Sequence, residues 1–524
     1  MADHIRLARH RIRKFVRLHS LVAATGTTWS ELPMLRATSL AATCFLTANV
    51  LHAASCSFAF CWSKEGVINQ FFCVHHWMDL QYFYQTRKLR ILVVCQQSGS
   101  AAFPDPFNLL QWPGDHLPDC IQEYFGADLA FFFHWFNAYT RFLVYPALLS
   151  APILVQDAFF KESVPETVRW GEYVAFSIFL GVWSTAFLAR YKQLKNLKVL
   201  KWGMKHHDRG VAEIRRQFSD AYRDSWGEYC QQCFHWILCA AFMAETVFVT
   251  LFVSRLRVDA QEDPMGRSYG IRHEDLQAYG KFLITANIKI VDYIWTYLST
   301  NLSKIENWRT HAELRNKATE KLFAVKFVVY YYPFLYTILV KPVVRSDVDI
   351  SLCFKALSSD LRLFFFTQIA MEVMSLFISV IISWFKVASE QKKAGNKEYS
   401  YLEYQAKCPE YSDEDFMSDV QLQVINYGFL VMFGVCLPYV CCICFCVNFL
   451  FKRMLAYKVS YIYQRPSPFG AEGFGGEDLI ILLSWIGVIF NSYLVIFVSP
   501  LCGHLSSHPS LEMFGACSLL FKRG

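Results

Sequence analysis

A row of polar residues interrupts one apolar segment of the sequence. Lys289 and Asp292 carry charge there, and Thr296, Ser299 and Ser303 follow them. Measured from Asp292, the spacing is four, seven and eleven residues, which places these side chains on one face of a helix. A charge at the centre of a membrane helix costs roughly 2.5–3.5 kcal/mol, so such residues usually face an interior or a water-filled path. The stripe therefore predicts a hydrophilic conduit, and the alternative is helix-to-helix packing through hydroxyl groups.

Two isolated carboxylates, Glu245 and Glu372, lie in other apolar segments and allow the same two interpretations, a functional role or pairing inside a helix bundle. Patterns of catalytic residues are absent: there is no Gly-Lys-Ser/Thr phosphate loop, no His-Glu-x-x-His and no Gly-x-Ser-x-Gly. The cysteines between positions 441 and 446 sit in an apolar run, which favours small packing residues over zinc ligands. We expect no enzymatic activity, no cofactor and no nucleic-acid partner.

The composition indicates which elements must position these residues. Hydrophobic residues make up 54% of the 524 positions, aromatic residues 17% and charged residues 18%, against roughly 25% charged in ordinary soluble domains. The surplus apolar surface needs lipid around it. Ten-residue strands of alternating polarity are absent, so the fold class is an all-α polytopic membrane protein.

Nine segments are long and apolar enough to be read as helical spans of ~20 residues. Residue 438 is a proline inside a run too long for one span, which predicts a tight hairpin of spans seven and eight. The nine spans are 129–155, 173–189, 233–253, 282–302, 322–340, 363–385, the two halves of 424–451, and 479–499.

The regions outside the spans are assigned by position. Residues 1–117 are expected to form an N-terminal cytosolic region. Within them, the apolar segment 37–62 is either an additional span or a buried part of that region. Residues 118–500 form the transmembrane domain, and residues 501–524 form a C-terminal tail.

Orientation follows from the basic residues of the short loops, which favour the cytoplasm. Ten Lys and Arg residues lie between positions 190 and 223, after span two, and further groups follow spans four, six and eight. In the loop after span three, by contrast, Arg residues alternate with Asp and Glu. The ends after the even-numbered spans are therefore predicted to be cytoplasmic, and so is the N-terminus if the segment 37–62 does not span the membrane.

An ordered series of short motifs between residues 118 and 500 resembles the anoctamin (transmembrane-16) family. The motifs flank or occupy the spans in the family's order. In chain order they are Ile121–Gly126, Trp183 with Phe187 and Tyr191, Lys201–Gly203, Leu302–Thr310, Lys326–Val328, Tyr427–Phe429, Pro438, Asn448, Gln464–Pro466, Ala471–Gly475 and Asn491.

The resemblance implies a homodimer of ten-span subunits that conducts chloride or other anions, moves phospholipids, or does both. It implies a membrane-facing groove built from spans three to seven, with the stripe of span four in one wall. The implied groove residues are Lys289, Asp292, Thr296, Ser299, Ser303 and Lys326. Membrane lipids and anions are the implied partners, and the plasma membrane or endoplasmic reticulum is the implied location.

The sequence departs from the family pattern where the family binds calcium. Calcium takes six to eight oxygen ligands, and only Asp419 remains as a carboxylate among the matched positions of spans six to eight. Those positions are Ile381, Phe385, Asp419, Leu422, Phe451 and Leu455. Two nearby lysines, Lys386 and Lys452, are candidates for resident cations that pair with Asp419 or with lipid phosphate. The alternative is that both side chains only extend to the lipid headgroups. The sequence thus predicts calcium-independent activity.

A tenth span is not evident before Gly524, and the region before span one does not resemble the family's, so we expect a divergent or incomplete family member. The leading functional hypothesis is an anion- or lipid-transporting anoctamin without the family's calcium gating. The alternative is a non-conducting membrane tether or lipid-binding scaffold, which the degraded calcium site favours.

Overall fold

The computed structural model describes residues 73–75, 117–160, 165–205, 218–220, 222, 225–262, 273–344, 350–393, 395, 401–466, 468 and 470–498. All of them belong to the second of two units of the chain, residues 72–524. The apolar segment 37–62, nearly all of residues 1–117 and the tail 501–524 lie outside the described residues.

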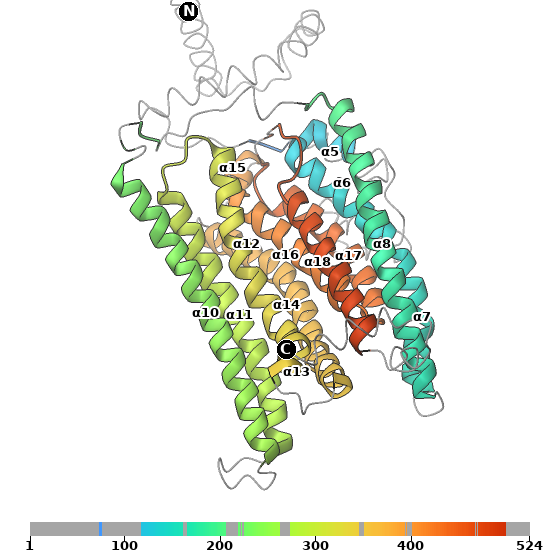
Figure 1. Cartoon of the computed structure of the whole chain (residues 1–524). Helices are drawn as coiled ribbons and strands as arrows, with labels where there is room; N and C mark the ends of the chain where they lie inside the picture. The colour runs from blue at the N-terminus through green and yellow to red at the C-terminus, as the bar shows by residue number, and fades with distance from the viewer. Residues whose placement is uncertain are drawn as a thin grey trace, which may run out of the picture. The chain divides into compact units, whose positions relative to one another are not determined.

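The described part of the chain is built from helices, and its isolated β-bridge joins Cys73 to Arg465. Figure 1 shows the long helices packed alongside one another. Their bounds are α5 (Leu117–Phe125), α6 (Ala127–Phe142), α7 (Val144–Phe159), α8 (Glu166–Lys201), α10 (Trp226–Glu262), α11 (His273–Ile305), α12 (His311–Leu335), α13 (Lys341–Val344), α14 (Ile350–Lys393), α15 (Tyr401–Lys407), α16 (Asp413–Phe433), α17 (Val440–Tyr457) and α18 (Glu477–Tyr493), with π-helical turns at Tyr336–Val340, Lys458–Ile462 and Leu494–Val498.

Six helical segments of the described chain are long and apolar enough to cross a membrane. They comprise α6 with α7, then α8, α10, α12, α17 and α18, the last three with their π-helical turns. The helices at expected spans four, six and seven, α11, α14 and α16, are not among them. The described part of the chain is therefore a set of helices consistent with an all-α polytopic membrane protein, and the number of nine spans stays a prediction.

Local sequence signals explain where several helices begin and break. Thr310 and Ser412 each start a helix through a capping box with the acidic residue three positions later, Glu313 and Asp415. Pro333 lies inside α12 and is followed by the π-helical turn at Tyr336–Val340, as expected where proline disturbs the ladder of hydrogen bonds. The turn between α16 and α17 contains residue 438, the proline expected in the hairpin.

The core is aromatic and is centred on α6. Phe132 and Trp135 are fully buried, and the ring of Phe474 lies 5.8 and 5.3 Å from theirs, measured between centroids. Tyr139, one turn further on, meets Tyr427 of α16 edge to face at 5.4 Å. Such ring pairs contribute about 0.5–1.5 kcal/mol beyond the area they bury. This core joins α6 to α16 and to the loop that precedes α18.

A second group of helices carries the polar residues. Helices α10, α11 and α12 pack against one another, and α14 contacts α11 and α12. In Figure 1, α10 and α11 lie side by side along most of their length. This group contains the stripe of span four.

Candidate functional site

The polar stripe of α11 faces neighbouring helices. Ser299 and Ser303 are buried, with 1% and 4% of their surface exposed, whereas Ile294 and Tyr297 on the other side are 47% and 70% exposed. The hydroxyl groups of Thr296 and Ser303 have no hydrogen-bond partner within the described chain. A buried polar group without a partner costs about 1–3 kcal/mol, so it is usually satisfied by water or by a bound molecule.

Asp292 forms an ion pair with α12. Lys326 Nζ lies 3.1 Å from Asp292 Oδ1, and the two side chains are 6% and 22% exposed. The structure thus brings Lys326, which the family motif pointed to, onto the stripe. The pair links α11 to α12 at the level of the predicted groove and compensates two charges that are costly inside a membrane.

Lys289 joins the stripe to α14 and α16 through amide side chains. It donates to Gln368 Oε1, and Gln368 Nε2 donates to Glu372 Oε1 at 2.6 Å. Asn426 of α16 donates to the same oxygen at 2.8 Å. The isolated carboxylate of Glu372 is therefore paired inside the bundle, which was one of its two interpretations. Glu245, by comparison, accepts a long 3.4 Å hydrogen bond from the adjacent Thr246.

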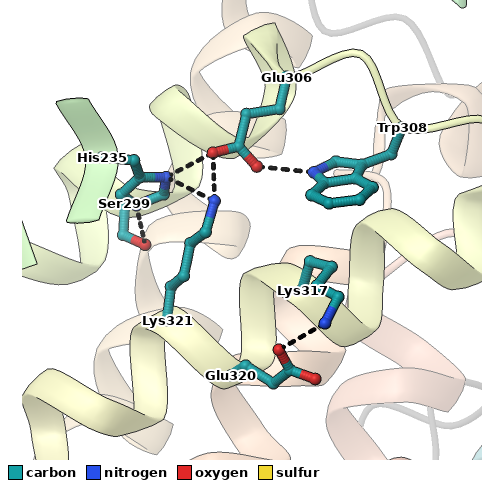
Figure 2. A network of polar contacts seen from close by, with 7 residues as sticks. All are labelled: His235, Ser299, Glu306, Trp308, Lys317, Glu320 and Lys321. Carbon is teal, nitrogen blue, oxygen red and sulfur yellow. Dashed lines mark hydrogen bonds and ion pairs between the residues drawn. The ribbon is translucent and has the colours of Figure 1, made fainter. Parts of the chain in front are cut away.

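A second buried network of polar side chains connects α10 and α12 to the loop that follows α11. Figure 2 shows the Glu306 carboxylate between three donors that come from α10, α12 and the loop after α11. His235 Nδ1 donates to Glu306 Oε1 at 2.8 Å, Lys321 Nζ forms an ion pair with the same oxygen, and Trp308 Nε1 donates to Oε2 at 2.7 Å. At most 4% of the His235, Glu306 and Lys321 surfaces is exposed.

This network also reaches the stripe. Because His235 Nδ1 donates to Glu306, its Nε2 is free to accept from the Ser299 hydroxyl, 3.4 Å away. Burial alone would raise the pKa of Glu306, but the hydrogen bonds from His235, Lys321 and Trp308 outweigh burial and lower that pKa. Glu306 is therefore held as a carboxylate.

Sequence reasoning missed His235, Glu306 and Lys321 as a cluster. Glu306 was visible only as part of the Leu302–Thr310 motif, and His235 as one polar residue in an apolar span. His235 and Lys321 lie 71 and 15 residues from Glu306 in the sequence, and neither separation matches a helical period. The available hint was a histidine and a lysine near the ends of spans three and five that are predicted to be cytoplasmic.

Asp419, the remnant of the expected calcium site, pairs with a cation that the sequence analysis did not name. Lys458 Nζ lies 3.0 Å from Asp419 Oδ2, and the Tyr411 hydroxyl donates to Oδ2 at 2.9 Å. Asp419 thus meets Lys458 rather than Lys386 or Lys452, and pairing of these two lysines with lipid phosphate stays a prediction. Lys452 donates to Asn137 of α6 at 3.0 Å, and Lys386 is exposed on α14. Lys458 is the first residue of the π-helical turn that follows α17.

These residues do not fit a calcium ion. At the matched positions of α17, Phe451 and Leu455 are buried and apolar, and calcium needs oxygen ligands. The single carboxylate is already neutralised by an ammonium group. In the described residues, no group of three or more His, Cys, Asp or Glu side chains converges as a metal site.

Comparison with known proteins identifies the family of this chain. The sequence model of the anoctamin family, described as a calcium-activated chloride channel, matches residues 121–518. The chain belongs to the anoctamin family. Mouse Anoctamin-5 is 22% identical over 377 residues, which cover 63% of this chain and 42% of that protein. Human Anoctamin-8 is 34% identical over 108 residues, 20% of this chain and 8% of its own length.

This anoctamin therefore aligns with less than half the length of the curated relatives it matches. Family membership and the apolar helices together establish an integral membrane protein of a family of channels and scramblases. The family description names calcium and chloride, whereas the residues around Asp419 do not fit calcium.

Proposed function

We propose that this anoctamin moves chloride or other anions, phospholipids, or both along the polar face that α11 shares with α12 and α14. The observation that supports this most directly is the pair of hydroxyl groups, on Thr296 and Ser303, that lack a hydrogen-bond partner in the described chain. Water or a phosphate headgroup would satisfy them. Lys289 on the same face supplies positive charge for anionic cargo, whereas the charge of Lys326 is compensated by Asp292.

Removing one hydroxyl tests this proposal. Thr296→Val keeps the shape of the side chain but removes its polar atom, so we expect slower lipid flipping or halide flux in liposomes reconstituted with the full chain. Thr285→Val is the matched control, because the Thr285 hydroxyl on the same helix is already bonded to the Lys281 carbonyl at 3.0 Å. Equal transport rates in Thr296→Val and wild type would instead favour a packing role.

We further propose that transport does not require calcium. A tethered ammonium group, Lys458, lies where a cation would neutralise Asp419, and the neighbouring positions are apolar. A calcium titration of flipping and flux in the same liposomes should therefore be flat through the micromolar range. Steep micromolar activation would contradict this part of the proposal and leave the transport path itself untouched.

A non-conducting tether or lipid-binding scaffold is the second candidate. It is favoured by the pairing of Asp292 with Lys326 and of Glu372 with Gln368 and Asn426, since paired groups can serve packing alone. The liposome assay separates the two functions, because a tether would show neither flipping nor halide flux.

The assembly and location of the chain are also proposals. By analogy with its family, we propose a homodimer in the plasma membrane or endoplasmic reticulum, in contact with membrane lipids. Light scattering of the detergent-purified chain would measure the oligomeric state. Imaging of a tagged chain in cells would show the membrane in which it resides.

A further inference from the structure

The first turns of α10 expose a continuous stripe that contains two cysteines. Trp226, Cys230, Cys233 and Ile237 are spaced by four, three and four residues, which places them on one face of the helix. Trp226 and Ile237 are 81% and 65% exposed, and both cysteines are exposed thiols. The stripe is therefore open to whatever surrounds the protein.

The opposite face of α10 is closed by its neighbours. His235 and Cys239 are 1% and 0% exposed, and α10 packs there against α11 and α12. Cys239 lies nine residues from Cys230, half a turn away from the stripe in projection. One helix thus presents two accessible cysteines and one inaccessible cysteine.

The stripe lies where the cytoplasmic surface of the membrane is expected. The basic segment 190–223 precedes α10, and span three begins at Cys233 in the sequence analysis. Trp226 and Tyr229, which is 51% exposed, are residue types enriched at the membrane–water interface. The thiols of Cys230 and Cys233 are therefore within reach of a cytoplasmic membrane enzyme, and apolar chains attached to them would enter the lipid beside Ile237.

We propose that Cys230 and Cys233 form an S-acylation site that carries long-chain fatty acyl groups. Cysteines beside a membrane span are typical acceptors for reversible acylation. The donor is a long-chain acyl-coenzyme A, supplied through a membrane acyltransferase. The cysteine sulfur attacks the thioester carbonyl, a new sulfur–carbon bond forms, the bond to coenzyme A breaks, and the proton of the cysteine thiol ends on the coenzyme A thiol. No oxidant or reductant is involved.

Other cysteines of the described chain fit this chemistry less well. Cys353, Cys436 and Cys441 are buried. Cys446 is exposed but lies in the middle of expected span eight, away from either surface. Among the residues that the structure describes, two exposed thiols lie beside interfacial aromatic residues at the start of α10.

Acyl exchange on the full chain expressed in cells tests the site. Free thiols are blocked, thioesters are cleaved with hydroxylamine, and each newly freed thiol is coupled to a polyethylene-glycol maleimide, which adds one mass step per acylated cysteine on a gel. We expect Cys230→Ser and Cys233→Ser each to lose one mass step and the double variant to lose two. Cys239→Ser is the matched control and should lose none.

Metabolic labelling with an alkynyl palmitate provides an independent readout, in which the double variant should lose most of the hydroxylamine-sensitive label. Because both side chains are exposed, we expect the serine variants to be expressed and to elute as wild type does on size exclusion. If the double variant did not fold, the mass steps lost by the two single variants would still show whether each cysteine is acylated. An unchanged number of mass steps in the double variant, or no hydroxylamine-sensitive step in wild type, would overturn the proposal.

Discussion

At the scale of single residues, Glu306 compensates buried charge in this protein. Its carboxylate meets Lys321, which is 2% exposed, and it also accepts hydrogen bonds from His235 and Trp308. Removing one partner of a buried ion pair is strongly destabilising, because the other charge stays buried without compensation. The network therefore holds the ends of α10, α11 and α12 in one arrangement.

Glu306→Gln should destabilise the protein by about 3–5 kcal/mol, because it leaves Lys321 charged in a buried site. We expect a lower melting temperature of the detergent-purified chain, measured by fluorescence-detected size exclusion after heating. Glu320→Gln is the matched control, because Glu320 precedes Lys321 in α12 and pairs with Lys317 in Figure 2. Glu320 pairs with Lys317 at 2.9 Å, but both side chains are about half exposed, and exposed pairs contribute about 0–1 kcal/mol. Equal shifts in the two variants would contradict the role of the buried pair.

At the scale of elements, a short segment near the N-terminal region ties several helices together. The backbone N–H of His75 donates to Gln405 of α15 at 2.7 Å. Its ring accepts from the Tyr124 hydroxyl of α5 at 3.0 Å and donates to the Tyr463 carbonyl at 3.3 Å. Arg465 lies over the Tyr124 ring at 4.0 Å. Residues 73–75 thus join α5, α15 and the chain after α17.

This joint should weaken in acid. Burial lowers the pKa of His75 from 6.5 to about 4, opposed by the hydrogen bond to Tyr463 and assisted by the charge of Arg465. The unfolded chain therefore takes up a proton near pH 6.5 and the folded chain only near pH 4, so stability is lost as the pH falls through this window. The loss amounts to roughly 3 kcal/mol in total.

Melting temperatures of wild type and His75→Gln, measured between pH 7 and pH 4, check this expectation. The variant lacks the titrating ring, so its stability should fall less over the window, whatever its stability at pH 7. Parallel pH profiles for the two proteins would show that His75 does not titrate as expected.

At the scale of the whole molecule, lipid is needed around the helices. Large apolar side chains are exposed along α10, α14 and α18, among them Phe248, Ile382 and Ile489 at 68%, 61% and 68%. In water such surfaces would drive aggregation. In a bilayer they are solvated, and the orientation of the helices then decides which loops meet the cytoplasm.

The Lys and Arg bias predicts that the N-terminus and the loop near Lys205 share the cytoplasmic side. Epitope tags at Ala2 and beside Lys205 should resist external protease in intact cells and be cut after permeabilisation. A tag inserted after Met265, between α10 and α11, should be cut in intact cells. Cleavage of the Lys205 tag from outside would overturn the topology, and with it the cytoplasmic position of Cys230 and Cys233.

The sequence by itself determined the class of the protein and the position of its long helices. Apolar runs of about 20 residues are local properties of the chain, because lipid requires every backbone group to be bonded within its own helix. The spacing of Asp292, Thr296, Ser299 and Ser303 likewise follows from helical geometry alone. The ordered motifs indicated that the chain belongs to the anoctamin family, and the family comparison confirms this.

Only the tertiary structure decided which charges meet. Asp419 pairs with Lys458, 39 residues away and outside any local period, rather than with Lys386 or Lys452. Glu306 meets His235 of α10 and Lys321 of α12, and Glu372 accepts a hydrogen bond from Asn426 of α16. Side-chain pairing between helices depends on how the helices rotate and cross, and packing of the whole bundle sets that rotation. A period in the sequence shows which face of a helix is polar, but not which partner that face will meet.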